Sequence, residues 1–151
     1  SNSVAFAFNG CLIGLGAGQQ NRVDCIRLAG DKARRWFIRN NDMVIEEYKE
    51  YIRERNIAHS YNEQYEFIKN ILPTLEEGTL LKRVIAWNRN QDVVLSSDGF
   101  LPFDDNIVAA HQYGVKYVIN PGGSVSDRKV TDKCDEYDMA MCITGRRFFY
   151  H

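Results

Sequence analysis

The pattern of hydrophobic and polar positions predicts a β-hairpin at the start of the chain and a helix after it. Two apolar runs, Val4–Phe8 and Cys11–Leu15, flank Asn9-Gly10, and this dipeptide is typical of a tight hairpin turn. The segment Gly16–Asn21 then leads into residues with a helical apolar period. The apolar stripe of this predicted helix comprises Val23, Ile26, Ala29 (or Gly30), Ala33 and Phe37.

The glycine-rich segment Gly16–Asn21 allows two interpretations. A glycine-rich loop at a helix N-terminus can present backbone N–H groups to an anion. The segment is, however, neither a G-x-G-x-x-G fingerprint nor a Walker A loop. The alternative, which we favour, is a tight turn whose glycines let the helix approach the preceding strand closely.

The middle of the chain, about residues 41–90, is rich in long charged side chains with scattered aromatic residues. The pattern predicts helices over Met43–Arg55, Asn62–Leu72 and Leu75–Asn88, with Pro73 separating the last two. Because this helical stretch lies between two strand-bearing parts, we expect it to be an insertion at the edge of a sheet.

Strands and helices alternate in the last third of the chain. The predicted strands are Val93–Leu95, Val115–Ile119 and Met139–Ile143, and the predicted helices are Asp105–Tyr113 and Ser124–Tyr137. This β-α-β-α-β order predicts parallel strands with right-handed crossovers. Together with the antiparallel hairpin, it predicts an α/β fold with a mixed sheet.

Three segments follow the ends of these strands: the corner Phe100–Asp105, the turn Pro121–Ser124 and the pair Arg146-Arg147. Ligands of open α/β sheets bind beyond the carboxyl ends of the strands, so we expect a binding site there. Asp104 is suited to cap the next helix, and Asp105 is favoured by the helix dipole. The alternative is a buried corner whose phenylalanines are core and whose acids only cap.

The two adjacent arginines also allow two interpretations. A guanidinium beside free helix N-termini suits a phosphate or carboxylate ligand. The alternative is surface charge, or a salt bridge to Asp98, Asp104 or Asp105. We favour the alternative for Arg146 and the ligand for Arg147.

Composition narrows the class of protein. Hydrophobic residues make up 44% of the chain and charged residues 26%, which is typical of one globular domain. A net charge of −1 gives no electrostatic case for a nucleic acid or an anionic membrane as partner, and no apolar run is long enough to span a bilayer.

The four cysteines lack a C-x-x-C pair, so we expect free thiols in a reducing cytosol rather than a disulfide or zinc framework. They are Cys11, Cys25, Cys134 and Cys142.

Several sequence blocks resemble a known family, in the order and at the separations found there. They are S-N-S-V at Ser1–Val4, G-L-G-A-G-Q-Q-N-R-V at Gly14–Val23, R-L-A-G-D-K-A at Arg27–Ala33, S-S-D-G-F-L-P-F-D-D-N-I at Ser96–Ile107, P-G-G-S-V-S-D at Pro121–Asp127 and T-G-R-R-F-F-Y-H at Thr144–His151. Together they resemble the C-terminal part of AICAR transformylase, the formyl-transferring portion of a bifunctional purine-biosynthesis enzyme that is also an IMP cyclohydrolase.

The resemblance implies a fold and a reaction. The fold is cytidine-deaminase-like, a three-layer α/β/α arrangement, with residues 1–151 as the second of two halves and a helical insertion at about 41–90. The reaction moves a formyl group from 10-formyltetrahydrofolate to the amine of the ribotide AICAR, giving FAICAR. The family is expected to work in the cytosol as a homodimer whose active sites lie across the dimer interface.

The resemblance also assigns ligand-binding residues, motif by motif. The ribotide-binding residues are Asn2, Phe100 and Arg147, and the folate-binding residues are Val23, Asp105, Ser124 and Val125. Asp105 would face the pterin and accept N–H bonds from it. A monovalent-cation site is implied as well, with ligands at Ser1, Ser3, Asp98 and carbonyls near Phe148 and Tyr150.

The chain departs from the family in one important respect. The catalytic Lys-His pair of the family lies before the S-N-S motif, and this chain contains no Lys-His dipeptide. General acid–base work needs such a group within hydrogen-bond reach, and none of His59, His111 and His151 fills that motif. We therefore expect an inactive fragment, or one chain of a split enzyme that needs the missing N-terminal half.

Two other classes of function follow from the same residues. The first is a non-catalytic nucleotide- or folate-binding module without its catalytic half. The second is a small zinc deaminase, which is nearly excluded because Pro121-Gly122-Gly123-Ser124 stands where those enzymes carry P-C-x-x-C. We expect no zinc.

Overall fold

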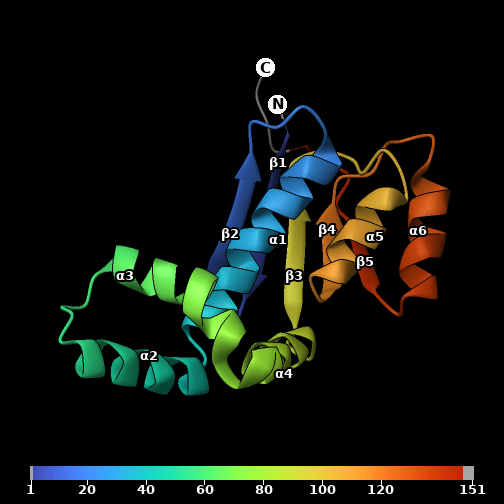
Figure 1. The fold of residues 1–151 in the computed structure, drawn as a ribbon. Helices are drawn as coiled ribbons and strands as arrows, with labels where there is room; N and C mark the ends of the chain where they lie inside the picture. The colour runs from blue at the N-terminus through green and yellow to red at the C-terminus, as the bar shows by residue number, and fades with distance from the viewer. Residues whose placement is uncertain (1, 148–151) are drawn as a thin grey trace. The chain divides into compact units, whose positions relative to one another are not determined.

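The structure is a computed structural model that describes residues 2–147 (Figure 1). The chain forms two compact units. Among the described residues, unit 1 comprises 2–33 and 89–147, and unit 2 comprises 34–88. The strands are β1 (Ser3–Phe8), β2 (Cys11–Ala17), β3 (Val93–Ser97), β4 (Val115–Asn120) and β5 (Ala140–Ile143). The helices are α1 (Arg22–Arg39), α2 (Asp42–Arg55), α3 (Tyr61–Glu66), α4 (Thr79–Arg89), α5 (Asp105–Gln112) and α6 (Asp127–Glu136), with a π turn η1 (Phe67–Ile71) and a 3-10 segment η2 (Leu72–Gly78).

Unit 1 contains a five-stranded mixed sheet in the order β2-β1-β3-β4-β5. Strand β1 is antiparallel to β2 and β3, whereas β3, β4 and β5 are parallel. The hairpin turns at Asn9 (φ 48°) and Gly10 (φ 76°), where two left-handed residues match the twist of the flanking strands. The predicted hairpin, the parallel segment and the α/β class are confirmed.

The helices α1, α5 and α6 lie along one face of this sheet (Figure 1). The strand residues that point toward them, such as Val4, Phe6, Leu95 and Val118, are buried. Within the described part of unit 1 the sheet therefore has one helical layer. The cytidine-deaminase-like arrangement with helices on both faces stays a prediction.

Helix α1 packs unusually close to strand β2 because β2 carries glycines at the contact. A Cβ atom at Gly16 would overlap the carbonyl oxygen of Cys25, and one at Gly14 would overlap that of Ala29. The first turn of α1 is capped locally, since Asn21 Oδ1 accepts the backbone N–H of Asp24 at 2.8 Å. These contacts support the packing interpretation of the glycine-rich segment over the anion-binding one.

Unit 2 is helical and has its own apolar core around Phe67, Leu72 and Val84. Helix α2 matches its predicted range to one residue. The predicted start of the last helix at Leu75 is wrong, because α4 begins at Thr79. The chain leaves helical geometry before it, with Glu76 and Glu77 at φ values of 50° and 55°.

Candidate functional site

The segments that follow β3, β4 and β5 meet at one edge of the sheet, as predicted from the parallel strand order. The backbone N–H of Gly145 donates to the carbonyl of Pro121 at 3.2 Å and so joins the segments after β5 and β4. The guanidinium carbon of Arg147 lies 5.7 Å from the ring centroid of Phe100, which follows β3. Two residues predicted to bind the ribotide are therefore neighbours.

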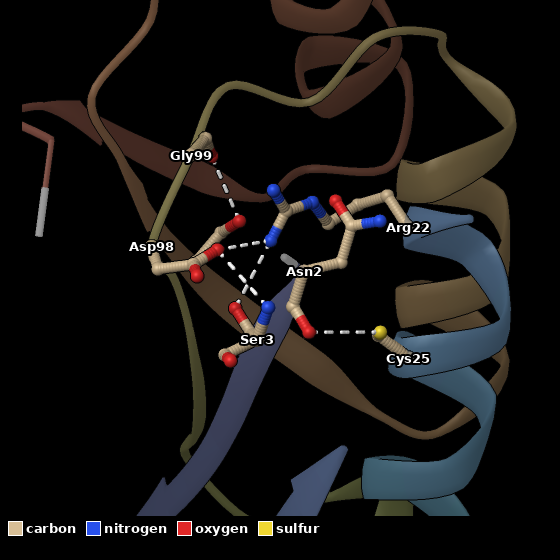
Figure 2. A network of polar contacts seen from close by, with 7 residues as sticks. Asn2, Ser3, Arg22, Cys25, Asp98 and Gly99 are labelled. Atoms are coloured by element: carbon tan, nitrogen blue, oxygen red, sulfur yellow. Dashed lines mark hydrogen bonds and ion pairs between the residues drawn. The ribbon is translucent and has the colours of Figure 1, made fainter. Parts of the chain in front are cut away.

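A buried ion pair ties this edge to the beginning of the chain (Figure 2). Arg22 pairs with Asp98 Oδ1 and also donates to the carbonyl of Ser3 at 3.1 Å. The N–H of Ser3 donates to the same carboxylate oxygen at 3.1 Å, and the Cys25 thiol donates to the carbonyl of Asn2 at 3.4 Å. The network joins the start of β1, the first two turns of α1 and the residue after β3.

The ion pair also bears on two sequence predictions. Asp98 was a candidate partner for Arg146 or Arg147, but the partner that the structure gives it is Arg22. Asp98 was also a candidate cation ligand, and its Oδ1 is already engaged by Arg22 and Ser3. Of the other proposed cation ligands, those at Ser1, Phe148 and Tyr150 lie outside the described residues. The cation site stays a prediction.

Two predicted folate-binding residues line one cavity of about 370 Å³. Val23 reaches it from the first turn of α1, and Asp105 from the first turn of α5. Its volume is within the range of small-molecule sites in proteins. Arg22, Asp24, Arg27 and Phe103 also line it, so the cavity combines two guanidinium groups, two carboxylates and an aromatic ring.

The aromatic corner is only partly a core feature. Leu101 is buried and anchors the corner, whereas Phe103 is 61% exposed. Phe100 is half-buried. The interpretation in which both phenylalanines belong to the core is therefore wrong for Phe103, which lines the cavity instead.

Asn106, rather than Asp104, organises the N-terminus of α5. Asp104 occupies the N-cap position, but its side chain makes no capping hydrogen bond, so the predicted cap is wrong. The fully buried Asn106 amide donates to the carbonyl of Phe103 at 2.8 Å and to Asp105 Oδ1 at 3.0 Å. It therefore fixes the direction of the Asp105 carboxylate beside the cavity.

The turn after β4 is built differently from the prediction. Helix α6 begins at Asp127 rather than at Ser124. The Asp127 carboxylate accepts N–H bonds from Gly123 at 2.7 Å and Ser124 at 3.1 Å. Val125 is fully exposed. Neither Ser124 nor Val125 lines the cavity that holds Val23, so their folate contact stays a prediction.

The described histidines lie away from this cavity. The His111 ring stacks on Tyr137 with centroids 4.1 Å apart. Both rings line a different cavity together with Val115 and Ala140, the first residues of β4 and β5, at the opposite edge of the sheet. His59 Nδ1 is hydrogen-bonded to the Tyr48 hydroxyl within unit 2, and His151 is outside the described residues.

Arg22 is the site residue that the sequence predictions missed. Its position inside the G-Q-Q-x-R-V motif, next to Val23, was the available signal. The structure shows that its side chain is 6% exposed and borders the cavity while paired with Asp98.

By fold and by the side chains at its strand ends, the chain is an α/β protein with a candidate ligand site at the carboxyl edge of its sheet. Parts of the chain are similar to known proteins. The profile of the AICARFT/IMPCHase bienzyme matches residues 1–32. The bifunctional purine biosynthesis protein PurH of Clostridioides difficile (strain 630) is 46% identical over 74 residues, which cover 47% of this chain and 14% of that protein.

The PurH protein of Prochlorococcus marinus (strain MIT 9211) is also 46% identical, over 66 residues that cover 44% of this chain and 13% of that protein. Over these segments the chain is therefore similar to the AICARFT/IMPCHase bienzyme, which confirms the resemblance drawn from the motifs. The matched part is a small share of each relative's length. The position of the chain in the C-terminal part stays a prediction.

A further finding concerns membranes. None of the helices within residues 2–147 has the length and apolar character needed to cross a bilayer.

Proposed function

We propose that the chain forms part of a formyltransferase site in purine biosynthesis, where a formyl group moves from 10-formyltetrahydrofolate to AICAR. The observation that supports this most is that Val23 and Asp105, far apart in sequence, line one cavity. Arg147 and Phe100 are neighbours at the same sheet edge. Two of the proposed folate-binding residues thus lie together, and so do two of the proposed ribotide-binding residues.

Each proposed role suits the chemistry of its side chain. Asp105 would accept N–H bonds from the pterin, and Asn106 already holds its carboxylate in place. Arg147 would make a charge-assisted bond to the polar end of the ribotide, beside the Phe100 ring that would line the base. Asn2 would contact the ribotide from the start of β1, which the Arg22–Asp98 pair fixes. Ser124 and Val125 would close the folate side.

The chain would need a partner segment for catalysis. Transfer to a weakly nucleophilic amine needs a general base, and His59 and His111 are engaged elsewhere. We propose that the N-terminal half of the transformylase supplies the Lys-His pair and that the chain works with it in a cytosolic homodimer. The exposed side chains of Leu12, Leu15 and Tyr117 on the sheet are apolar surface suited to association.

The test separates this proposal from a non-catalytic binding module. AICAR and 10-formyltetrahydrofolate are titrated separately against the chain by calorimetry, and formyl transfer is then measured with and without an added transformylase segment that carries Lys-His. We expect binding of both ligands, and turnover only with the added segment. Binding without turnover in the mixture favours the non-catalytic module. Turnover by the chain alone would contradict the missing-base argument, and binding of neither ligand would contradict both functions.

A further inference from the structure

Unit 2 contains a cavity of about 230 Å³ that the proposed formyl transfer does not use. It lies between the last turns of α1 and the α3–η1 segment. Three cations line it, Arg35 and Arg39 from α1 and Lys69 from η1, and none of its described lining residues is a carboxylate. The cavity is therefore an electropositive pocket.

These three cations differ from their neighbours on α2. Lys49, Arg53 and Arg55 each form an ion pair with a glutamate of α2. Within residues 2–147, by contrast, Arg35, Arg39 and Lys69 form no ion pair. Bringing like charges together without a counter-charge is unfavourable, so an anion at this place would relieve the repulsion.

Aromatic side chains complete the cavity. Tyr61 is 66% exposed and Tyr65 is 37% exposed, and both line the cavity. The Arg39 guanidinium lies 5.8 Å from the Tyr61 centroid, which places charge and ring side by side. Ile68 adds an apolar contact. Flat rings stack on such surfaces with an offset or edge-to-face geometry.

A rare backbone feature accompanies the cavity. Helix α3 continues into the π turn η1 (Phe67–Ile71), and π turns are infrequent and often occur at functional sites. At this turn Phe67 is buried in the unit 2 core, while the next two residues, Ile68 and Lys69, line the cavity.

We propose that this cavity binds a small aromatic anion, a single flat ring that carries a carboxylate or phosphate group. The ring stacks on Tyr61 and Tyr65, and the acid group lies among Arg35, Arg39 and Lys69. The volume sets the size, because about 230 Å³ is below the usual range for drug-sized ligands and holds one ring with its acid groups. The site is separate from the residues proposed to bind ribotide and folate.

The test uses the whole chain and defined probes. Phenyl phosphate and benzene-1,3-dicarboxylate are titrated against ¹⁵N-labelled protein, with cyclohexyl phosphate and inorganic phosphate as ligand controls. We expect saturable amide shifts within residues 61–69 for at least one aromatic probe, and weaker binding of both controls. The tighter of the two aromatic probes identifies the acid group.

Two variants locate the site. Lys69→Gln should weaken the aromatic probe about tenfold, as expected for the loss of one charge-assisted bond. Lys82→Gln, a matched exposed lysine on α4 outside the cavity, should leave its affinity unchanged. The proposal is overturned if no probe shifts residues 61–69, if cyclohexyl phosphate binds as well as phenyl phosphate, or if both variants weaken binding equally.

Discussion

Replacing Asp98 with asparagine tests whether the buried ion pair holds the candidate site together. The side chains of Arg22 and Asp98 are 6% and 12% exposed. Removing one partner of a buried pair costs about 3–5 kcal/mol. Asparagine keeps the Oδ1 acceptor for Arg22 and Ser3, which recovers about 1 kcal/mol. We therefore expect Asp98→Asn to lower the free energy of unfolding by about 2–4 kcal/mol, out of a typical total of about 5–15 kcal/mol.

The matched control is Asp92→Asn, at the other end of β3. Asp92 pairs with Lys116 at 3.5 Å, but the two side chains are 70% and 39% exposed, so the loss should be at most about 1 kcal/mol. Both variants are measured by urea unfolding followed by circular dichroism. Equal losses for the two variants, or a loss below about 1 kcal/mol for Asp98→Asn, would refute the argument that this pair fixes the site.

Two further predictions concern packing and a buried thiol. Gly16→Ala should lower the free energy of unfolding by about 3 kcal/mol, because the added Cβ would lie 2.8 Å from the carbonyl carbon of Cys25, a backbone atom that cannot rotate away. The free energy is measured by urea unfolding, and a value equal to that of the unchanged protein would contradict the close approach of α1 and β2. Burial raises the pKa of the Cys134 thiol to about 11 from its ordinary value of 9.0, so the exposed Cys11 and Cys142 should react with a thiol reagent at pH 8 while Cys134 reacts only on unfolding. Because the folded pKa is raised, its contribution to stability should be complete below pH 9 and decline between about pH 9 and 11.

The sequence predicts the sheet well because its signals are local. Asn9-Gly10 specifies the hairpin, and alternating strands and helices after Val93 specify parallel pairing with right-handed crossovers. The parallel order in turn places the segments containing Phe100 and Arg147 at one edge, as the structure shows.

What the sequence could not predict depends on competition between neighbours or on contacts across the fold. Asp104 and Asn106 both suit a helix start, and only the structure shows that Asn106 makes the hydrogen bonds. The backbone of Glu76 is left-handed although this residue is neither a glycine nor an asparagine. The residue type therefore did not indicate the late start of α4. The Arg22–Asp98 pair joins segments that are distant in sequence. The order of the strands in the sheet brings these two residues together, and no spacing in the sequence indicates it.

The central claim is tested most directly by a two-by-two titration in an enzyme that includes the Lys-His segment. Asp105→Asn should weaken folate binding about 5- to 150-fold, because an amide N–H would face a pterin N–H at a cost of about 1–3 kcal/mol, and should leave AICAR affinity unchanged. Arg147→Gln should weaken AICAR by about tenfold or more through the lost charge-assisted bond, and should leave folate affinity unchanged. The adjacent residues supply the controls, and Asp104→Asn and Arg146→Gln should alter neither affinity. If Asp105→Asn and Arg147→Gln each weaken both ligands equally, the two residues support the fold rather than separate ligands, and the account is contradicted.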